Sequence, residues 1–236
     1  MKTNSRSLNL FGALLVLCAT VASAGAPRGV HWPHLRAPRG HSYGHTLEEL
    51  AESWCQRKVS FLQREQEAEV CDYGQSGRVW FLANGTETSD EFHTNRRECV
   101  APEGRALFFP IDAALVFSTP DFPLTEDDLR AQSSLYLGYN TNRLCEIDGR
   151  PIENLERYRR QTPVFPLAWP GRGDVPAGTY PAVADGYWIL LAPLPVGSHT
   201  IHVITGAPGS DYYIDLLIQL TIVPASEYVP ADPGSD

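Results

Sequence analysis

Acidic side chains next to apolar runs are the residues of this sequence with the most direct route to catalysis. Asp112 follows the run Arg105–Ile111, Asp185 precedes the run Tyr187–Leu194, and Glu156 lies between them along the chain. A carboxyl pair can act as general acid and general base in hydrolysis. A hydrolase that uses Asp185 with Glu156 is therefore one functional hypothesis, although nothing in the sequence fixes the separation of the two groups.

Arginine and aromatic side chains suggest ligand binding instead. The segment Arg157-Tyr158-Arg159-Arg160 gathers three guanidinium groups, which bind carboxylates or sulfates in bidentate geometry, as on acidic polysaccharides. The alternative for this segment is a solvated turn with local ion pairs, and we favour that alternative. Trp169 lies in a predicted loop, where an exposed ring could stack on a sugar, whereas most other aromatic side chains are expected in the core.

Three further motifs carry weaker signals. Four histidines fall within a short segment without periodicity, so they impose no geometry and we assign no metal site; they are His31, His34, His41 and His45. The segment Gly74–Gly77 resembles a nucleophile elbow, but Arg78 stands where that motif needs glycine. Arg172-Gly173-Asp174 is an integrin-recognition tripeptide, and three such common residues also recur by chance. No cofactor motif is recognised.

The N-terminal segment has the pattern of a secretory signal peptide. Lys2 and Arg6 precede the apolar run Leu8–Val21, and Ala22-Ser23-Ala24 matches an A-x-A cleavage site. The apolar run is too short to span a bilayer. We expect a mature chain of about 212 residues (236 minus 24) that begins near Gly25 in a secreted or periplasmic location.

The charge of the expected mature chain limits its partners. Loss of Lys2 and Arg6 leaves 17 basic against 28 acidic residues, a net charge of −11. Such a surface repels phosphate backbones, so we expect no nucleic-acid partner. The chain has no second apolar stretch of membrane-spanning length, so no transmembrane segment is expected. Polysaccharide or envelope glycan remains as a partner class, and the oligomeric state is not indicated.

Cysteine usage agrees with an oxidising compartment. Cleavage leaves Cys55, Cys71, Cys99 and Cys145, an even number that allows three disulfide connectivities. Cys71 and Cys99 flank the same strand-and-loop unit, so we favour their pairing, which would contribute about 3.5 kcal/mol. Cys55 with Cys145 would form the second bridge. C-x-x-C spacing is absent, so a zinc ribbon is not supported.

Periodicity predicts two helices. Thr46 and Glu49 form a capping box for an amphipathic helix over Leu47–Ala68 with Trp54 on its inner face. Acidic residues after Thr125 begin a second short helix that runs to about Tyr139.

Apolar runs between glycine and proline predict strands. They are Arg78–Ala83, Arg105–Ile111, Tyr187–Leu194, His199–Thr205 and Tyr212–Ile222, with a hairpin over Cys145–Ile152. The last strand alternates, so one face is expected to be buried. That face carries Tyr212, Ile214, Leu216, Ile218, Leu220 and Ile222, and the other carries Tyr213, Asp215, Gln219 and Thr221. The pattern predicts a mainly β fold, an antiparallel β-sandwich of jelly-roll or immunoglobulin-like type over residues 46–223. Residues 25–45 are expected to be a flexible linker and residues 224–236 a disordered tail.

Several segments resemble a family of bacterial secreted proteins of unassigned function. The matching segments are Gly74–Ala83, Arg97–Ile111, Asn154–Arg159, Ala184–Leu194 and His199–His202. They span most of the expected mature chain. The resemblance implies an envelope or extracellular location and a Cys71–Cys99 disulfide, and it implies no activity. This chain departs from the family pattern in the first helix, where Trp54 is the only tryptophan, and after Ile111, where Asp112-Ala-Ala-Leu115 replaces asparagine and acidic residues.

Taken together, these features favour a non-enzymatic binding module of the cell envelope or extracellular matrix, with glycan as the first partner class. The chain is acidic and rich in aromatic residues, and it lacks a recognisable catalytic constellation. A secreted hydrolase with a carboxylate pair and a structural envelope protein are the alternatives.

Overall fold

A computed structural model describes residues 35–36, 40–61, 71, 74–82, 94–206 and 213–230 of the 236-residue chain. The expected signal peptide lies outside the described residues, as do His31 and His34. All elements below belong to one compact unit, His31–Asp236. Among the residues that the structure describes, no helix is long and apolar enough to cross a membrane.

Two five-stranded sheets make up most of the described chain. The first, which we call the β3–β8 sheet, has the strand order β1–β3–β8–β6, and β7 also pairs with β8. Its strands are β1 (Val79–Phe81), β3 (Ala106–Phe117), β6 (Arg159–Gln161), β7 (Phe165–Trp169) and β8 (Gly178–Leu191). The second, the β9–β10 sheet, has the order β2–β10–β9–β4–β5. Its strands are β2 (Asn95–Pro102), β4 (Arg143–Ile147), β5 (Arg150–Pro151), β9 (Gly197–Gly206) and β10 (Tyr213–Val223).

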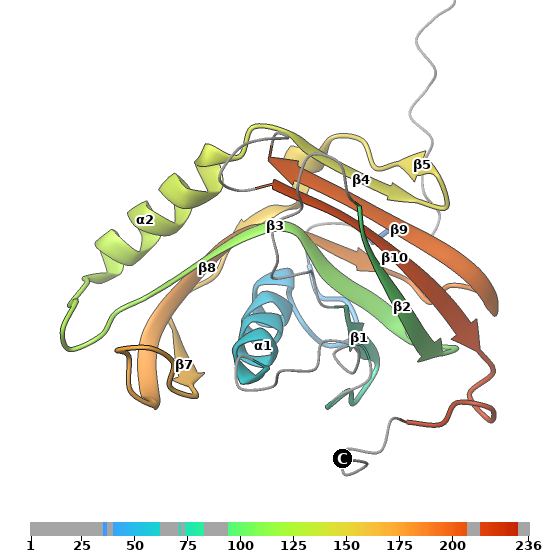
Figure 1. Cartoon of the computed structure of the whole chain (residues 1–236), viewed down its shortest axis with the longest axis horizontal. Coiled ribbons are helices and arrows are strands. Elements are labelled where there is room, and N and C mark those ends of the chain that lie inside the picture. Colours follow the sequence, from blue (N-terminus) through green and yellow to red (C-terminus); the bar gives the residue numbers. More distant parts are fainter. Residues whose placement is uncertain are drawn as a thin grey trace, which may run out of the picture. The chain divides into compact units, whose positions relative to one another are not determined.

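The two sheets form a sandwich-like arrangement, so the predicted fold class is confirmed (Figure 1). Leu107 and Ile189 of the first sheet share one hydrophobic cluster with Val203 and Leu220 of the second. Each sheet contains one parallel pair, β1 with β3 and β2 with β10, so the sheets are mixed rather than wholly antiparallel. The β1–β3 pair is parallel because the chain crosses to the other sheet through β2 before it returns.

Helix α1 (Leu47–Ser60) packs on the side of the β3–β8 sheet opposite the β9–β10 sheet (Figure 1). Its capping box forms between Thr46 and Glu49 as predicted. Trp54 faces inward, donates its indole N–H to the Leu82 carbonyl at 2.8 Å and meets the Trp188 ring edge-on at 5.8 Å. The helix is capped at its C-terminus by Phe61, and the rest of the predicted helix, residues 62–68, lies outside the described residues.

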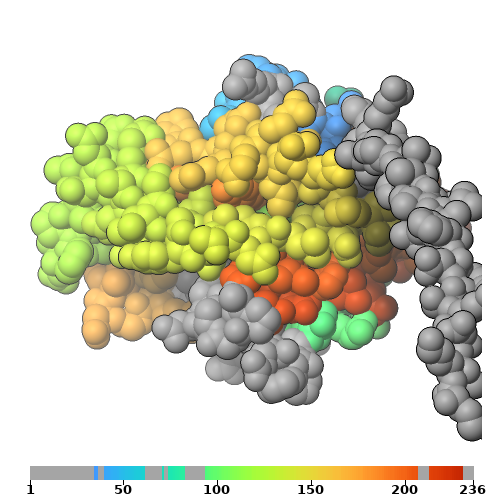
Figure 2. Space-filling view, turned by 90° about the horizontal axis from the view of Figure 1, so that it is seen from above, coloured from blue at the N-terminus to red at the C-terminus, as the bar shows by residue number. Residues whose placement is uncertain are grey.

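Helix α2 (Glu126–Tyr139) begins at its Thr125 cap, as predicted, and covers the far ends of β3 and β8. Leu129 packs there against Val116 and Val183. Both strands extend beyond their predicted bounds, and these extensions lie under α2. In the space-filling view α2 and the chain that follows it into β4 form one continuous band over this face (Figure 2).

A β-bulge in β3 changes which face its later residues take. Pro110 pairs with Trp188, but the next paired residue is Asp112, which lies opposite Tyr187. Ile111 is the extra residue, and it packs in the sandwich core. Ile111 and Asp112 therefore point toward the same side of the β3–β8 sheet. As a result, Asp112 faces the β9–β10 sheet and α2 instead of α1.

A disulfide joins Cys71 to Cys99, with their Cα atoms 5.6 Å apart. The second predicted bridge is not formed, since Cys55 and Cys145 are both buried free thiols. Cys55 packs with α1 on one side of the β3–β8 sheet, whereas Cys145 belongs to the sandwich core on the other side. The sheet between them excludes the pairing, because disulfide geometry requires adjacent Cβ atoms.

Parts of the predicted linker and tail contact the domain. Leu35 forms a bridge with Leu191, and the Arg36 amide donates to the Leu190 carbonyl at 2.9 Å. At the other end, Tyr228 meets the Trp80 ring edge-on at 5.5 Å. Tyr228, which lies in the segment predicted to be a disordered tail, therefore packs against the core, while disorder of residues 224–236 stays a prediction.

Candidate functional site

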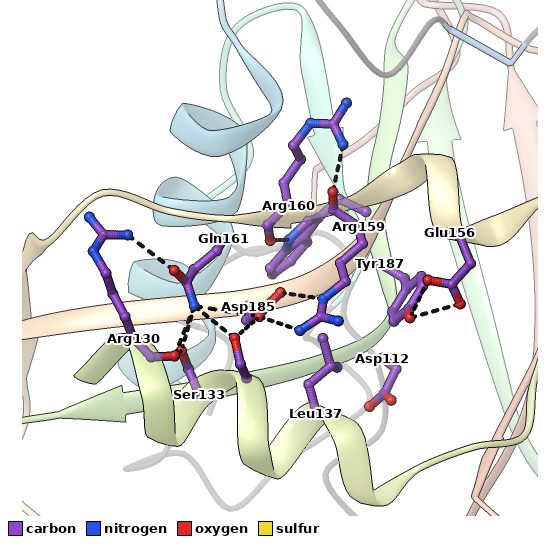
Figure 3. Close-up of polar contacts among 12 residues, drawn as sticks. Asp112, Arg130, Ser133, Leu137, Glu156, Arg159, Arg160, Gln161, Asp185 and Tyr187 are labelled. Atoms are coloured by element: carbon purple, nitrogen blue, oxygen red, sulfur yellow. Dashed lines mark hydrogen bonds and ion pairs between the residues drawn. The ribbon is translucent and has the colours of Figure 1, made fainter. Parts of the chain in front are cut away.

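Beneath α2 lies a cluster of buried charged side chains centred on Asp185 (Figure 3). The Asp185 side chain is 2% exposed and binds the Arg159 guanidinium in bidentate geometry, at 3.1 Å from Nε and 2.8 Å from Nη2. Ser134 of α2 donates to the same carboxylate at 2.7 Å. Asp185 is thereby the point at which β8, β6 and α2 meet.

A second hydrogen-bonded bridge fastens α2 to β6. The side-chain Nε2 of Gln161 donates to the Arg130 backbone carbonyl at 3.0 Å, and Arg130 Nη1 donates to the side-chain Oε1 of Gln161 at 3.1 Å. The same amide lies 3.1 Å from the Ser134 hydroxyl. These contacts tie the second and third turns of α2 to the edge of the β3–β8 sheet.

Asp112 forms the other buried ion pair. Its side chain, 2% exposed, binds Nε of Arg143 at 2.8 Å, and the Asn140 amide lies 3.3 Å from each carboxylate oxygen. The Arg143 guanidinium also donates to the Leu137 carbonyl and lies 4.3 Å from the centre of the Tyr187 ring. Arg143 thus links β4, the end of α2 and β8.

Burial controls the protonation behaviour of this cluster. Desolvation raises the pKa of Asp112 above its usual range, and the Arg143 charge and hydrogen bond oppose that rise. Desolvation also raises the pKa of Tyr187, whose hydroxyl donates to Glu156 at 2.9 Å. Hydrogen bonding to Asp185 raises the pKa of Arg159. Folding therefore keeps Arg159 cationic and opposes ionisation of the Asp112 carboxyl.

The predicted acid/base pair of Asp185 and Glu156 is not arranged for catalysis. Glu156 binds the Tyr187 hydroxyl, while Asp185 is enclosed by Arg159 and Ser134. No contact joins the two carboxyl groups in the described part of the chain, and Figure 3 shows the Arg159 guanidinium between them. A general base must reach a substrate proton, and the Asp185 carboxylate is 2% exposed and accepts from Arg159 and Ser134. The contacts of Asp185 join α2 to β6 and β8.

Two arginines of the predicted ligand-binding segment Arg157–Arg160 bind other groups of the protein. Arg159 binds Asp185, and Arg160 lies 3.5 Å from Glu48 and donates to the carbonyls of Arg157 and Arg159. Tyr158, the last residue of the short 3-10 helix η2 (Leu155–Tyr158), is buried. Only Arg157 of the four is exposed. These ion pairs agree with the alternative that we favoured for this segment, a surface turn with local ion pairs. Contact of these residues with a ligand stays a prediction.

Trp169 is not in a loop but is the last residue of β7. Its ring packs at a tilt against Phe117, with the ring centres 4.8 Å apart, and its indole N–H donates to the Val175 carbonyl at 3.3 Å. The side chain is half-buried. The loop prediction failed because β8 begins at Gly178, which gives β7 a partner strand up to Trp169.

An open hollow of about 380 Å³ lies on the outer face of the β9–β10 sheet. Two rows of side chains flank it across β2, β10 and β9, paired in register as Glu98–Gln219–Thr200 and Val100–Thr221–Ser198. Between these rows lie Cys99, Leu220 and His199, whose side chains point away from this face because strand residues alternate. Backbone therefore forms much of the floor of the hollow.

Four polar side chains at this hollow differ from the polar groups under α2, which bind one another. In the part of the chain that the structure describes, the side chains of Glu98, Ser198, Gln219 and Thr221 make no hydrogen bond or ion pair. Asp148, from the β4–β5 turn, is fixed at one end: it accepts from the Thr200 amide at 2.8 Å and lies 2.9 Å from Nδ1 of His199. The hollow therefore presents one positioned carboxylate and several uncommitted polar groups.

Neither the cluster under α2 nor the hollow on the β9–β10 sheet gathers a set of metal-binding side chains among the described residues. Among the described residues, no group of three or more histidine, cysteine, aspartate or glutamate side chains has a geometry that could hold an ion. His45 lies 3.7 Å from Glu49, and His31 and His34 lie outside the described residues.

No family model and no curated protein matches this chain. Among solved structures, a chain from the complex of PbICP-C with falcipain-2 matches with 13% identity and a TM-score of 0.28, over 62% of this chain and 100% of that one. The solution structure of amebosin matches with 10% identity and a TM-score of 0.20, over 55% and 91%. The cysteine protease inhibitor EhICP2 from Entamoeba histolytica matches with 12% identity and a TM-score of 0.21, over 55% and 88%. At such TM-scores none of these matches assigns a family or a function.

Proposed function

We propose that this protein is a non-enzymatic glycan-binding module whose ligand occupies the hollow on the outer face of the β9–β10 sheet. The observation that carries the proposal is a set of polar side chains that have no partner among the described residues, Glu98, Ser198, Gln219 and Thr221, around a hollow of about 380 Å³. That volume falls within the range of small-ligand sites, about 300–1,000 Å³. The buried acids elsewhere are engaged within the fold, which favours binding over hydrolysis.

The chemistry of the lining suits a polyhydroxylated ligand. Carboxylate and amide groups each offer two neighbouring hydrogen-bonding atoms, and hydroxyl groups both donate and accept. Glu98, Gln219 and Thr200 stand side by side on adjacent strands, about 4.8 Å apart. A row with this spacing can bind several hydroxyl groups of one sugar ring. Val100 adds a small apolar surface for the carbon face of the ring.

Charge narrows the ligand class. Glu98 and Asp148 are carboxylates, and no arginine or lysine is found among the described residues that line the hollow. The whole chain carries a formal net charge of −9. Uronic acids and sulfated sugars would be repelled, so the proposed ligand is a neutral or amino-bearing glycan. This differs from the acidic polysaccharide that an exposed arginine cluster would select.

A glycan array probed with purified, oxidised protein tests the proposal. We expect selective binding to neutral or amino-bearing glycans. Gln219→Ala removes up to two hydrogen bonds and should weaken binding about threefold to tenfold, while Gln132→Ala on α2 is the matched control. Glu98→Gln should reduce any preference for amino sugars, with exposed Glu153→Gln as its control. A blank array obtained with folded protein would overturn the proposal.

A further inference from the structure

The turn between β7 and β8 presents two exposed groups of opposite charge at its tip. Arg172 and Val175 form an isolated bridge, with the Arg172 amide 3.1 Å from the Val175 carbonyl and the reverse bond at 3.3 Å. Gly173 and Asp174 occupy the two central positions. Gly173 has φ +59°, a backbone conformation that tight hairpin turns require and that side chains disfavour.

Aromatic side chains of β7 and β8 hold this turn through hydrogen bonds to its backbone carbonyls. The Trp169 indole donates to the Val175 carbonyl at 3.3 Å, and the Tyr180 hydroxyl donates to the Pro176 carbonyl at 3.0 Å. The Phe117 ring packs against both aromatic rings, at 4.8 and 5.8 Å. Such bracing reduces the entropy that the turn would lose on binding.

The charged groups at the tip are free to meet a partner. Arg172 and Asp174 are exposed, and within the described residues, which are continuous here from 94 to 206, neither side chain has a hydrogen bond or ion pair. The two side chains form no ion pair with each other. On α2, by contrast, Glu126 forms an ion pair with Arg130 at 2.8 Å.

We propose that the Arg172-Gly173-Asp174 turn is a second binding site, for a receptor protein that holds an exposed divalent cation beside an acidic pocket. The Asp174 carboxylate is a hard oxygen ligand suited to Mg²⁺, Mn²⁺ or Ca²⁺. The Arg172 guanidinium forms bidentate pairs with carboxylates. A partner must supply both the cation and the acids, and this is the chemistry by which receptors of the integrin class recognise the same tripeptide. The site is separate from the hollow, which involves none of these residues.

Binding of the purified, oxidised protein to an immobilised integrin ectodomain that recognises Arg-Gly-Asp peptides tests this proposal. In Mn²⁺ we expect saturable binding that EDTA and a soluble Arg-Gly-Asp peptide abolish. Asp174→Glu displaces the carboxylate by one methylene and should weaken binding at least about tenfold. Asp121→Glu, at the exposed turn bridged by Thr119 and Phe122, is the matched control and should bind as the unaltered protein does. Absence of binding by folded protein, or binding that Asp174→Glu leaves unchanged, would overturn the proposal.

Discussion

Asp112 lies directly opposite Tyr187 across the β3–β8 pair because Ile111 occupies a β-bulge. The bulge turns the carboxylate toward Arg143 of the other sheet, which binds it at 2.8 Å and covers the Tyr187 ring at 4.3 Å. One extra residue in β3 therefore places a buried ion pair, instead of an apolar contact, where the two sheets and α2 meet.

The two members of this ion pair should respond very differently to substitution. Arg143→Met leaves the buried Asp112 carboxylate without its cation and should lower the free energy of unfolding by about 3–5 kcal/mol at neutral pH. Asp112→Asn should cost less than about 1.5 kcal/mol, because Arg143 keeps the Leu137 carbonyl and the Tyr187 ring. Urea denaturation of both variants measures the asymmetry, and equal costs would contradict it.

The cost of Arg143→Met should also depend on pH. Burial already raises the pKa of Asp112, and loss of the arginine raises it further. A carboxyl whose folded pKa is raised favours folding fully below its ordinary pKa, about 3.9, and that contribution is lost as the pH rises through the folded pKa. The difference in unfolding free energy between the variant and the unaltered protein should therefore grow from pH 4 to pH 7. A difference that is independent of pH would contradict this origin.

Gly186 allows the close approach of the bulged backbone. A Cβ atom at this position would lie 2.9 Å from the Asp112 carbonyl oxygen and 2.8 Å from the Trp188 ring. Gly186→Ala should lower the free energy of unfolding by about 1–3 kcal/mol. Gly138→Ala in α2, where a Cβ meets nothing within 4 Å, is the control and should stabilise by up to about 1 kcal/mol. Thermal unfolding compares them, and a loss at Gly138 as large as at Gly186 would refute the steric explanation.

The sequence predicted the positions of helices and strands more accurately than the long-range contacts between them. Helix caps at Thr46 and Thr125 and the alternation of the last strand are local signals, and the structure confirms them. The bulge at Ile111 could not be seen, because a period-2 pattern assigns Ile111 and Asp112 to opposite faces. The free thiols of Cys55 and Cys145 were missed for a related reason: pairing depends on which side of a sheet each residue takes.

At the candidate site, too, the sequence indicated local features but not long-range pairing. Gln219 and Thr221 were placed correctly on the face opposite the buried one, but the register that sets Glu98 and Thr200 beside them is a long-range property. Asp112 and Asp185 were visible as single acids next to apolar runs, a pattern that indicates burial with a cation. Their arginine partners, Arg143 and Arg159, come from other strands, so spacing along the chain carried no signal for either pairing.

The Cys71–Cys99 disulfide should contribute substantially to stability. It links the segment before β1 to β2, an edge strand of the other sheet, across a sequence separation of 28. Replacing both residues with alanine should lower the free energy of unfolding by about 3.5 kcal/mol. Cys55 and Cys145 should not react with a thiol reagent in the native protein, since burial raises the pKa of both thiols. Rapid native labelling of either thiol would contradict the structure.

The most direct test of the proposed function is an NMR titration of the isotope-labelled protein with a neutral or amino-bearing glycan selected on the array. The account predicts amide shift changes confined to β2, β9 and β10 around Glu98, Thr200 and Gln219, and their weakening in Gln219→Ala. Shift changes centred on Arg157–Arg160 or Trp169, with the β9–β10 sheet unaffected, would contradict it.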